Sequence, residues 1–118
     1  MNTRIHFKDL DPSELAKEVI LDRLTDAEAR FPELRRHKTS VVLSMENSPQ
    51  HPGPDVFGVK LAITGPIFKD VILEKKAGNL YMAAALVHEA LLERLNRSTD
   101  RARVRKRIQE RLVNSKAL

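Results

Sequence analysis

The spacing of apolar residues divides this chain into segments of two kinds. In residues 12–30 and again in 80–97, apolar side chains recur every three or four positions, which is the period of one helix face. In residues 38–46 and 56–64 they alternate with other residues, which is the period of a strand. A chain of 118 residues holds one ordinary domain, so both kinds of segment must share a single core.

Shorter signals complete the order of the elements. Residues 3–8 also alternate and predict a first strand, and residues 67–75 predict a fourth. Asp11, followed by Pro12, predicts the cap of the first helix, and Asn79 predicts the cap of the second. The sequence therefore predicts an α+β domain of order β-α-β-β-β-α. In this fold a four-stranded, mostly antiparallel sheet carries both helices on one face.

The composition argues against most kinds of active site. The absence of Cys excludes disulfides, thiolate metal sites and a Cys nucleophile. The four Gly are isolated, so none builds a phosphate-cradling loop, and no two His have metal-ligand spacing. We therefore expect a protein that binds rather than catalyses, with no catalytic residues, metal, cofactor or small-molecule substrate.

No apolar run approaches the roughly 20 residues of a membrane helix, and the first residues lack the core of a signal peptide. We therefore expect a cytoplasmic protein with no membrane partner.

Positive charge is concentrated at the end of the chain. Residues 94–118 contain nine Lys or Arg against two acidic residues, a net charge of +7, whereas residues 1–93 have a net charge of −2. Such a segment favours a polyanion through counterion release, and Arg contacts phosphate with a planar, bidentate group. On a continuous helix, Arg94, Arg97, Arg101 and Arg105 would share one broad face. The complete set of candidate RNA-binding residues is Lys75, Lys76, Arg94, Arg97, Arg101, Arg103, Arg105, Lys106 and Arg107.

The same segment carries a second apolar pattern. Val104, Ile108 and Leu112 repeat every four residues but are rotated away from the stripe in 80–97. The run Ser98-Thr99-Asp100 is a candidate break or re-capping point, so we divide the chain into a domain at 1–97 and a basic helical extension at 98–118. A solvated tail and a surface that docks on a partner protein, or on a second copy, remain alternatives.

The opening Ile5-His6-Phe7 and the following Asp11-Pro12-Ser13 look like the first strand and first helix of a known family. They resemble the bacterial ribosome hibernation-promoting factor family, also called ribosome-associated inhibitors or ribosomal subunit interface proteins. The run Asn79-Leu80-Tyr81-Met82-Ala83-Ala84 resembles the family's Asp-Met-Tyr-x-Ala-Ile pattern, and the likeness extends over residues 3–101. The chain resembles the short form of the family, without a second, dimerising domain.

The resemblance implies a fold related to that of double-stranded RNA-binding domains. It also implies a translation inhibitor that binds ribosomal RNA of the small subunit, blocks the channel for messenger and transfer RNA by occupancy, and acts in the bacterial stress response. Arg97 and Arg101 match basic positions of the family, while Ala90 and Glu93 stand where Lys and Arg are typical.

Two alternatives remain open: a general module for double-stranded RNA or DNA, and a divergent relative that binds another protein. We further expect Tyr81 to lie in the core or to anchor its helix.

Overall fold

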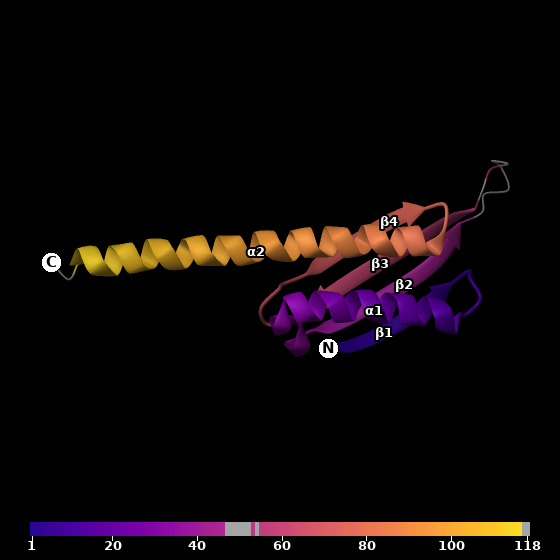
Figure 1. The fold of residues 1–118 in the computed structure, drawn as a ribbon, viewed down its shortest axis with the longest axis horizontal. Helices are drawn as coiled ribbons and strands as arrows, with labels where there is room; N and C mark the ends of the chain where they lie inside the picture. The colour runs from indigo at the N-terminus through magenta and orange to yellow at the C-terminus, as the bar shows by residue number, and fades with distance from the viewer. Residues whose placement is uncertain (47–52, 54, 117–118) are drawn as a thin grey trace.

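The computed structural model describes residues 1–46, 53 and 55–116, with all their side chains except those of 102–104 and 113–116. Residues 47–55 are rich in Pro and Gly and so predict a loop, and most of them, including His51, lie outside the described residues. The fold is a four-stranded sheet with two helices on one face, in the predicted β-α-β-β-β-α order (Figure 1). The elements are β1 (Asn2–Lys8), α1 (Glu14–Arg30), the short 3-10 helix η1 (Pro32–Arg36), β2 (Lys38–Glu46), β3 (Val56–Thr64), β4 (Val71–Ala77) and α2 (Leu80–Lys116).

The sheet follows the order of the chain, β1-β2-β3-β4. β1 and β2 are parallel because α1 connects them, and the other two pairs are antiparallel. The register places Ile5 opposite Val41, Val41 opposite Leu61, and Leu61 opposite Leu73. These side chains form an apolar row across one face. Because two of the three strand pairs are antiparallel, the predicted mostly antiparallel sheet is confirmed.

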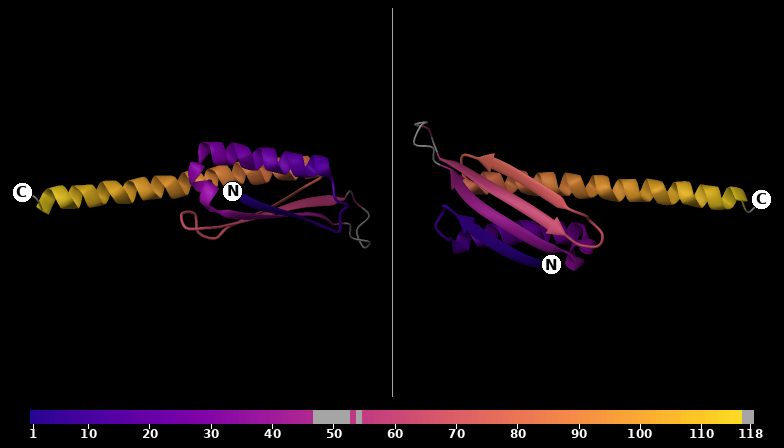
Figure 2. Two further views of the ribbon diagram at one scale, coloured as in Figure 1. Left: turned by 90° about the horizontal axis from the view of Figure 1, so that it is seen from below. Right: turned by 180° about the vertical axis from the view of Figure 1, so that it is seen from behind.

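Both helices bury their apolar stripes against that face, and the opposite face stays uncovered (Figure 2). In α2 the stripe extends as far as Leu91 and Leu95, which are 1% and 0% exposed. Full burial of a Leu side chain contributes about 1.5–3 kcal/mol. The buried helix residues are Ala16, Ile20, Leu24 and Ala27 in α1 and Ala83, Ala84, Val87, His88, Leu91 and Leu95 in α2.

Two predicted boundaries are wrong. Ser13, not Asp11, caps α1: its backbone is extended and its Oγ accepts a hydrogen bond from the N–H of Ala16 at 3.2 Å. β4 begins at Val71 rather than at 67, because the chain before it turns. In that turn Phe68 is buried edge-on against Phe31, with ring centroids 6.3 Å apart.

Of the two roles expected for Tyr81, a place in the core is wrong, and anchoring of its helix stays a prediction. Its side chain is 47% exposed. Tyr81 lies on the same side of α2 as His88, seven residues later, which contacts α1.

His37, just before β2, is hydrogen-bonded to the turn between β3 and β4. Its ring is 2% exposed, and its Nε2 accepts hydrogen bonds from the N–H groups of Phe68 at 2.8 Å and Ile67 at 3.3 Å. Its Nδ1 lies 2.9 Å from the carbonyl oxygen of Glu33. Since Nε2 accepts, the proton sits on Nδ1 and is donated to that carbonyl. The ring leaves no room beside it, because a Cβ added to Gly65 would lie 2.2 Å from His37 Cδ2.

A second histidine links the two helices. His88 of α2 is 9% exposed, and its Nε2 lies 2.8 Å from Asp26 Oδ2 of α1. The other ring nitrogen lies 3.4 Å from a guanidinium nitrogen of Arg23, and Arg30 pairs with the same Asp26 oxygen at 3.2 Å. This polar cluster fixes the position of α2 along α1.

Gly65→Ala should lower the free energy of unfolding by about 1–3 kcal/mol, because the added methyl group overlaps the His37 ring. Gly78→Ala is the matched control: nothing lies within 4 Å of its added Cβ, so stability should change by no more than about 0.5 kcal/mol. Urea unfolding of both variants measures the difference. Equal effects would contradict the role given to His37.

Asp26 and His88 should be energetically coupled. A double-mutant cycle with Asp26→Ala and His88→Ala should give a coupling free energy of about 0.5–3 kcal/mol, because each change removes a hydrogen-bond partner of the other. Asp22→Ala, an exposed carboxylate one turn earlier, should show no coupling to His88→Ala. Additive effects of Asp26 and His88 would mean that the contact does not hold the helices together.

Candidate nucleic-acid interface

α2 continues well past the sheet as one unbroken helix of 37 residues, about 55 Å long. The expected break at Ser98-Thr99-Asp100 is absent. The Ser98 and Thr99 hydroxyls donate to the carbonyl oxygens four residues earlier, Arg94 at 3.1 Å and Leu95 at 2.9 Å, so they remain compatible with the helix. No Gly or Pro lies between Leu80 and Lys116. The distal part therefore projects from the domain and gives the whole molecule its longest dimension of 71 Å (Figure 1).

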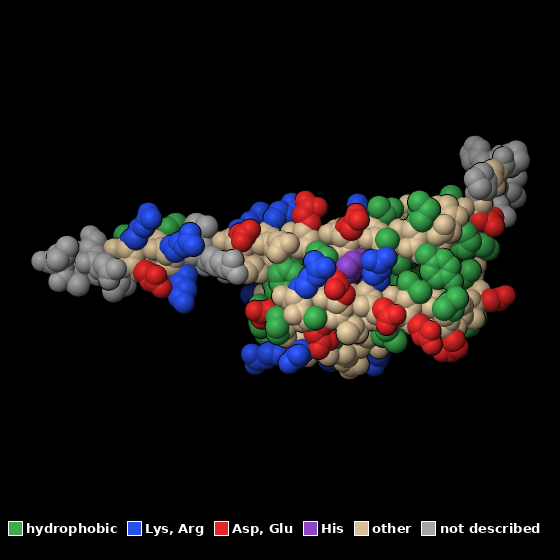
Figure 3. Space-filling model, in the orientation of Figure 1, with side chains coloured by type: hydrophobic (Ala, Val, Ile, Leu, Met, Phe, Trp, Pro, Cys, Tyr) green, Lys and Arg blue, Asp and Glu red, His purple; other side chains and the backbone are tan. Residues whose placement is uncertain are grey.

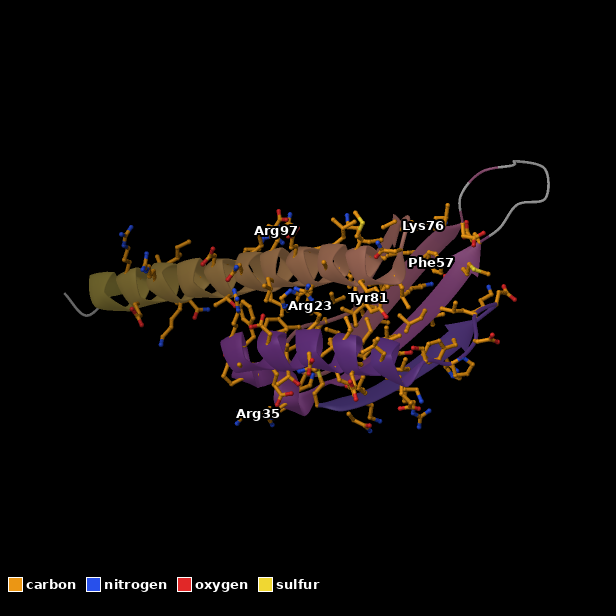
Figure 4. All side chains as sticks on the ribbon, turned by 45° about the vertical axis from the view of Figure 1, so that its right-hand side comes forward. Arg23, Arg35, Phe57, Lys76, Tyr81 and Arg97 are labelled. Carbon is orange, nitrogen blue, oxygen red and sulfur yellow. The ribbon has the colours of Figure 1, made fainter. Side chains whose placement is uncertain are left out.

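The predicted arginine face is present on this helix. Arg94, Arg97, Arg101 and Arg105 are all exposed, and helical geometry places them within an arc of about 80°. Arg97 is held only loosely, by a 4.0 Å contact with Glu93, and lies on the side of α2 away from α1 (Figure 4). Planar, exposed cations at this spacing suit the phosphates of a nucleic-acid backbone.

Other predicted cations surround the projecting helix. Lys106 and Arg107 are exposed on the side roughly opposite Arg101, and Arg111 adds a further charge. The backbone of Arg103 belongs to the same helix, but its side chain lies outside the described residues. Positive charge therefore encircles the projecting part instead of being confined to one face.

Lys75 and Lys76 do not join this cluster. Both lie in β4 near the start of α2, and Arg97 is 17 residues further along that helix, about 25 Å away. Their side chains also point to opposite faces of the sheet, because they are neighbours in a strand. Lys76 pairs with Glu46 at 3.0 Å across Gly58, and this hydrogen bond raises the pKa of Lys76.

The structure adds basic residues that the sequence analysis did not single out. Arg35, Arg36, Lys38 and Lys69 are exposed at the end of the domain where His37 joins η1 to the β3–β4 turn. Arg35 is paired with Glu28 at 3.3 Å, while the other three form no ion pair among the described residues. The basic run Arg35-Arg36-His37-Lys38 was the sequence signal for this cluster.

The projecting part of α2 leaves the domain at this same end. A groove of about 230 Å³ lies between Arg30 and Phe31 of the first helix end and Thr99 and Asp100 of α2. The space-filling view shows an open corner here, with Lys and Arg side chains both along the helix and on the domain below it (Figure 3). Arg35 lies on the domain side of this corner, whereas Arg97 points away from it, on the far side of α2 (Figure 4).

The rest of the helical layer is not basic. α1 has five acidic residues against three basic ones, and residues 80–93 of α2 contain Glu89 and Glu93 but no Lys or Arg. Glu93 is exposed and Ala90 is half-buried. In α2 the positive charge thus lies in the part that projects past the sheet and not in the part that covers it.

Among the described residues, no group of three or more His, Asp or Glu is placed to hold a metal ion. In that same part of the chain, no helix has the length and apolar content needed to cross a bilayer.

The fold is similar to that of two solved structures. The crystal structure of the N-terminal domain of Protein Y from Thermus thermophilus matches with a TM-score of 0.64 and 17% identity, over 82% of this chain and 98% of that one. The structure of a ribosomal subunit interface protein from Coxiella burnetii matches with a TM-score of 0.68 and 13% identity, over 85% of this chain and 99% of that one. No protein-family model matches the sequence, and comparison with curated proteins finds no match.

Both of these structures are matched over almost their whole length, whereas 15–18% of this chain has no counterpart in them. At such low identity the likeness establishes the fold, and the arginine face must be judged on its own chemistry.

Replacing Arg97, Arg101 and Arg105 together by Glu should abolish association with structured RNA while leaving the melting temperature nearly unchanged, because all three side chains are exposed. The control is Lys8→Glu with Lys60→Glu on the uncovered face of the sheet, which lowers the net charge by 4 against 6 for the triple variant and should retain most binding. Filter binding at several salt concentrations measures both variants. Equal loss in the two would mean that overall charge, not the arginine face, is responsible.

Proposed function

We propose that this protein binds the ribosome and restrains translation by occupancy. The observation that carries the proposal is the fold, shared with a ribosomal subunit interface protein over 99% of that chain. The contact surface would be the arginine face of α2, and Arg35 and Arg36, at the end of the domain where the helix leaves it, would add a second point of contact. Its target would be ribosomal RNA of the small subunit, in the channel used by messenger and transfer RNA.

The chemistry of this surface suits structured RNA better than single strands. A-form RNA is recognised mainly through its shape, phosphates and 2′-hydroxyls, whereas single-strand readers stack bases on aromatic side chains. Among the described residues, Phe31 and Phe68 are buried, Phe7 and Phe57 are half-buried, and Tyr81 lies far from the arginine face. Arg side chains along a rigid helix would therefore grip backbone phosphates without reading sequence.

Occupancy needs no bond to be made or broken, so this function requires binding alone. The part of α2 after Leu95, about 31 Å long, stands out from the domain and would enter a channel that the domain itself only borders. Such a factor would act in the bacterial cytoplasm, where ribosomes are found, and would belong to the stress response that slows translation.

One observation favours a second candidate. The family typically has basic residues where Ala90 and Glu93 stand here, and the layer of helices above the sheet is acidic on balance. The positive charge lies instead on the projecting helix, where it could bind any double-stranded RNA or DNA. A general duplex-binding module would show the same loss on charge reversal but no preference for ribosomes.

Sedimentation with ribosomes through sucrose gradients tests the first candidate. The protein should travel with the small subunit or the whole ribosome at about 50 mM salt and remain partly bound at about 200 mM, with the Arg97, Arg101 and Arg105 reversal abolishing both. An excess of unrelated RNA duplex should not displace it. Displacement by that duplex would support the general module, and failure of the folded protein to travel with ribosomes would refute ribosome binding.

A further inference from the structure

The uncovered face of the sheet contains a polar hollow of about 320 Å³ at the end where β2 begins. The right-hand view of Figure 2 shows this face, with the helices behind it. The hollow is lined by Asn2, Arg4, Lys38, Thr39, Ser40, Ala62 and Thr64.

The strand register explains why a hollow forms there. Arg4, Ser40 and Ala62 lie side by side in one cross-strand row, so two small side chains form the floor beside a long one. The next row toward the end of the sheet contains Lys38 and Thr64, whose longer side chains form a wall. Neighbouring rows on one face are about 7 Å apart, so both rows can reach a small ligand between them.

The groups around the hollow are donors suited to an anion. Arg4 offers up to five N–H donors and Lys38 three, and the hydroxyls of Ser40 and Thr64 can add two more. No acidic residue lines the hollow, and neither Arg4 nor Lys38 forms an ion pair within the part of the chain that the structure describes. On this face Lys76, by contrast, is already neutralised by Glu46.

We propose that this hollow is a binding site for a phosphate group, with Arg4 and Lys38 as its charged ligands and Ala62 as its floor. A guanidinium and an ammonium flanked by hydroxyls match the charge and the acceptor oxygens of phosphate. At about 320 Å³ the hollow also has room for the sugar to which a phosphate is attached. The site does not rest on ribosome binding, since it lies on the opposite side of the sheet from the helices.

Two sources could supply the phosphate. One is a free nucleotide. The other is the backbone of an RNA whose remaining phosphates lie against Arg36 and Lys69, because those residues occupy the same end of the domain.

The test is a titration of the isotopically labelled protein with inorganic phosphate at constant ionic strength, followed by amide NMR shifts. The amides of Arg4, Ser40 and Ala62 should shift and saturate, and chloride should not reproduce the effect. Arg4→Ala and Lys38→Ala should each weaken binding at least about tenfold. Lys60→Ala, a charge loss on the same face outside the hollow, should change affinity less than about twofold.

Ala62→Leu distinguishes binding in the hollow from non-specific attraction of phosphate to positive charge, because it fills the hollow and leaves every charge in place. Phosphate binding should be lost in a variant whose melting curve shows it folded, and Ser40→Val serves the same purpose if Ala62→Leu does not fold. The absence of saturable shifts, or equal weakening by Arg4→Ala and Lys60→Ala, would overturn the proposal.

Adenosine monophosphate and a short RNA duplex distinguish the two sources. Tighter binding of the nucleotide than of phosphate, sensitive to Ala62→Leu, would identify a nucleotide site. Competition between phosphate and duplex RNA, lost in Arg4→Ala, would identify an RNA contact. Neither result depends on whether the protein travels with ribosomes.

Discussion

Burial of the α2 stripe against the sheet is the constraint on which the rest of the structure depends. That stripe ends at Leu95, which is fully buried, while the helix continues to Lys116. Beyond Leu95 there is no sheet left to cover, and the hydroxyls of Ser98 and Thr99 are satisfied within the helix. No apolar surface of the sheet is therefore available to bend the helix back, and the distal part of α2 projects into solvent.

The projection determines where charge can accumulate. A buried surface can hold few unpaired cations, because taking a charge out of water costs several kcal/mol. An exposed helix has no such limit, so nine Lys or Arg occur between Arg94 and the end of the chain. Two exposed cations of the domain, Arg36 and Lys69, lie at the end where the helix leaves it. The two polar histidine contacts, at His37 and His88, hold that end and the helix in fixed relation to the sheet.

Covering one face of the sheet leaves the other free, and this second surface has its own chemistry. Small residues in the middle of a strand row, Ser40 and Ala62, produce a depression only because their neighbours across and along the strands are longer. Gly58 also has no side chain above the sheet, and Lys76 extends across it to pair with Glu46. One face thus serves packing, and the other presents an array of polar groups.

The sequence by itself determined the elements and the position of the charge. Alternation and helical period depend on neighbours close in the chain, so β2 and β3 were predicted correctly, and so was the shared side of α2 on which Arg94, Arg97, Arg101 and Arg105 lie, while their binding of RNA stays a prediction. It did not determine that Ser13 rather than Asp11 caps α1, that β4 starts at Val71, or that the helix passes Ser98 unbroken, since each depends on competing hydrogen bonds of the folded backbone. Only the tertiary structure separated Lys76 from Arg97, brought Arg36 and Lys69 to the helix exit, and set Arg4 beside Lys38. These residues are distant in sequence, and their proximity is fixed by strand register and helix packing, which no local pattern encodes.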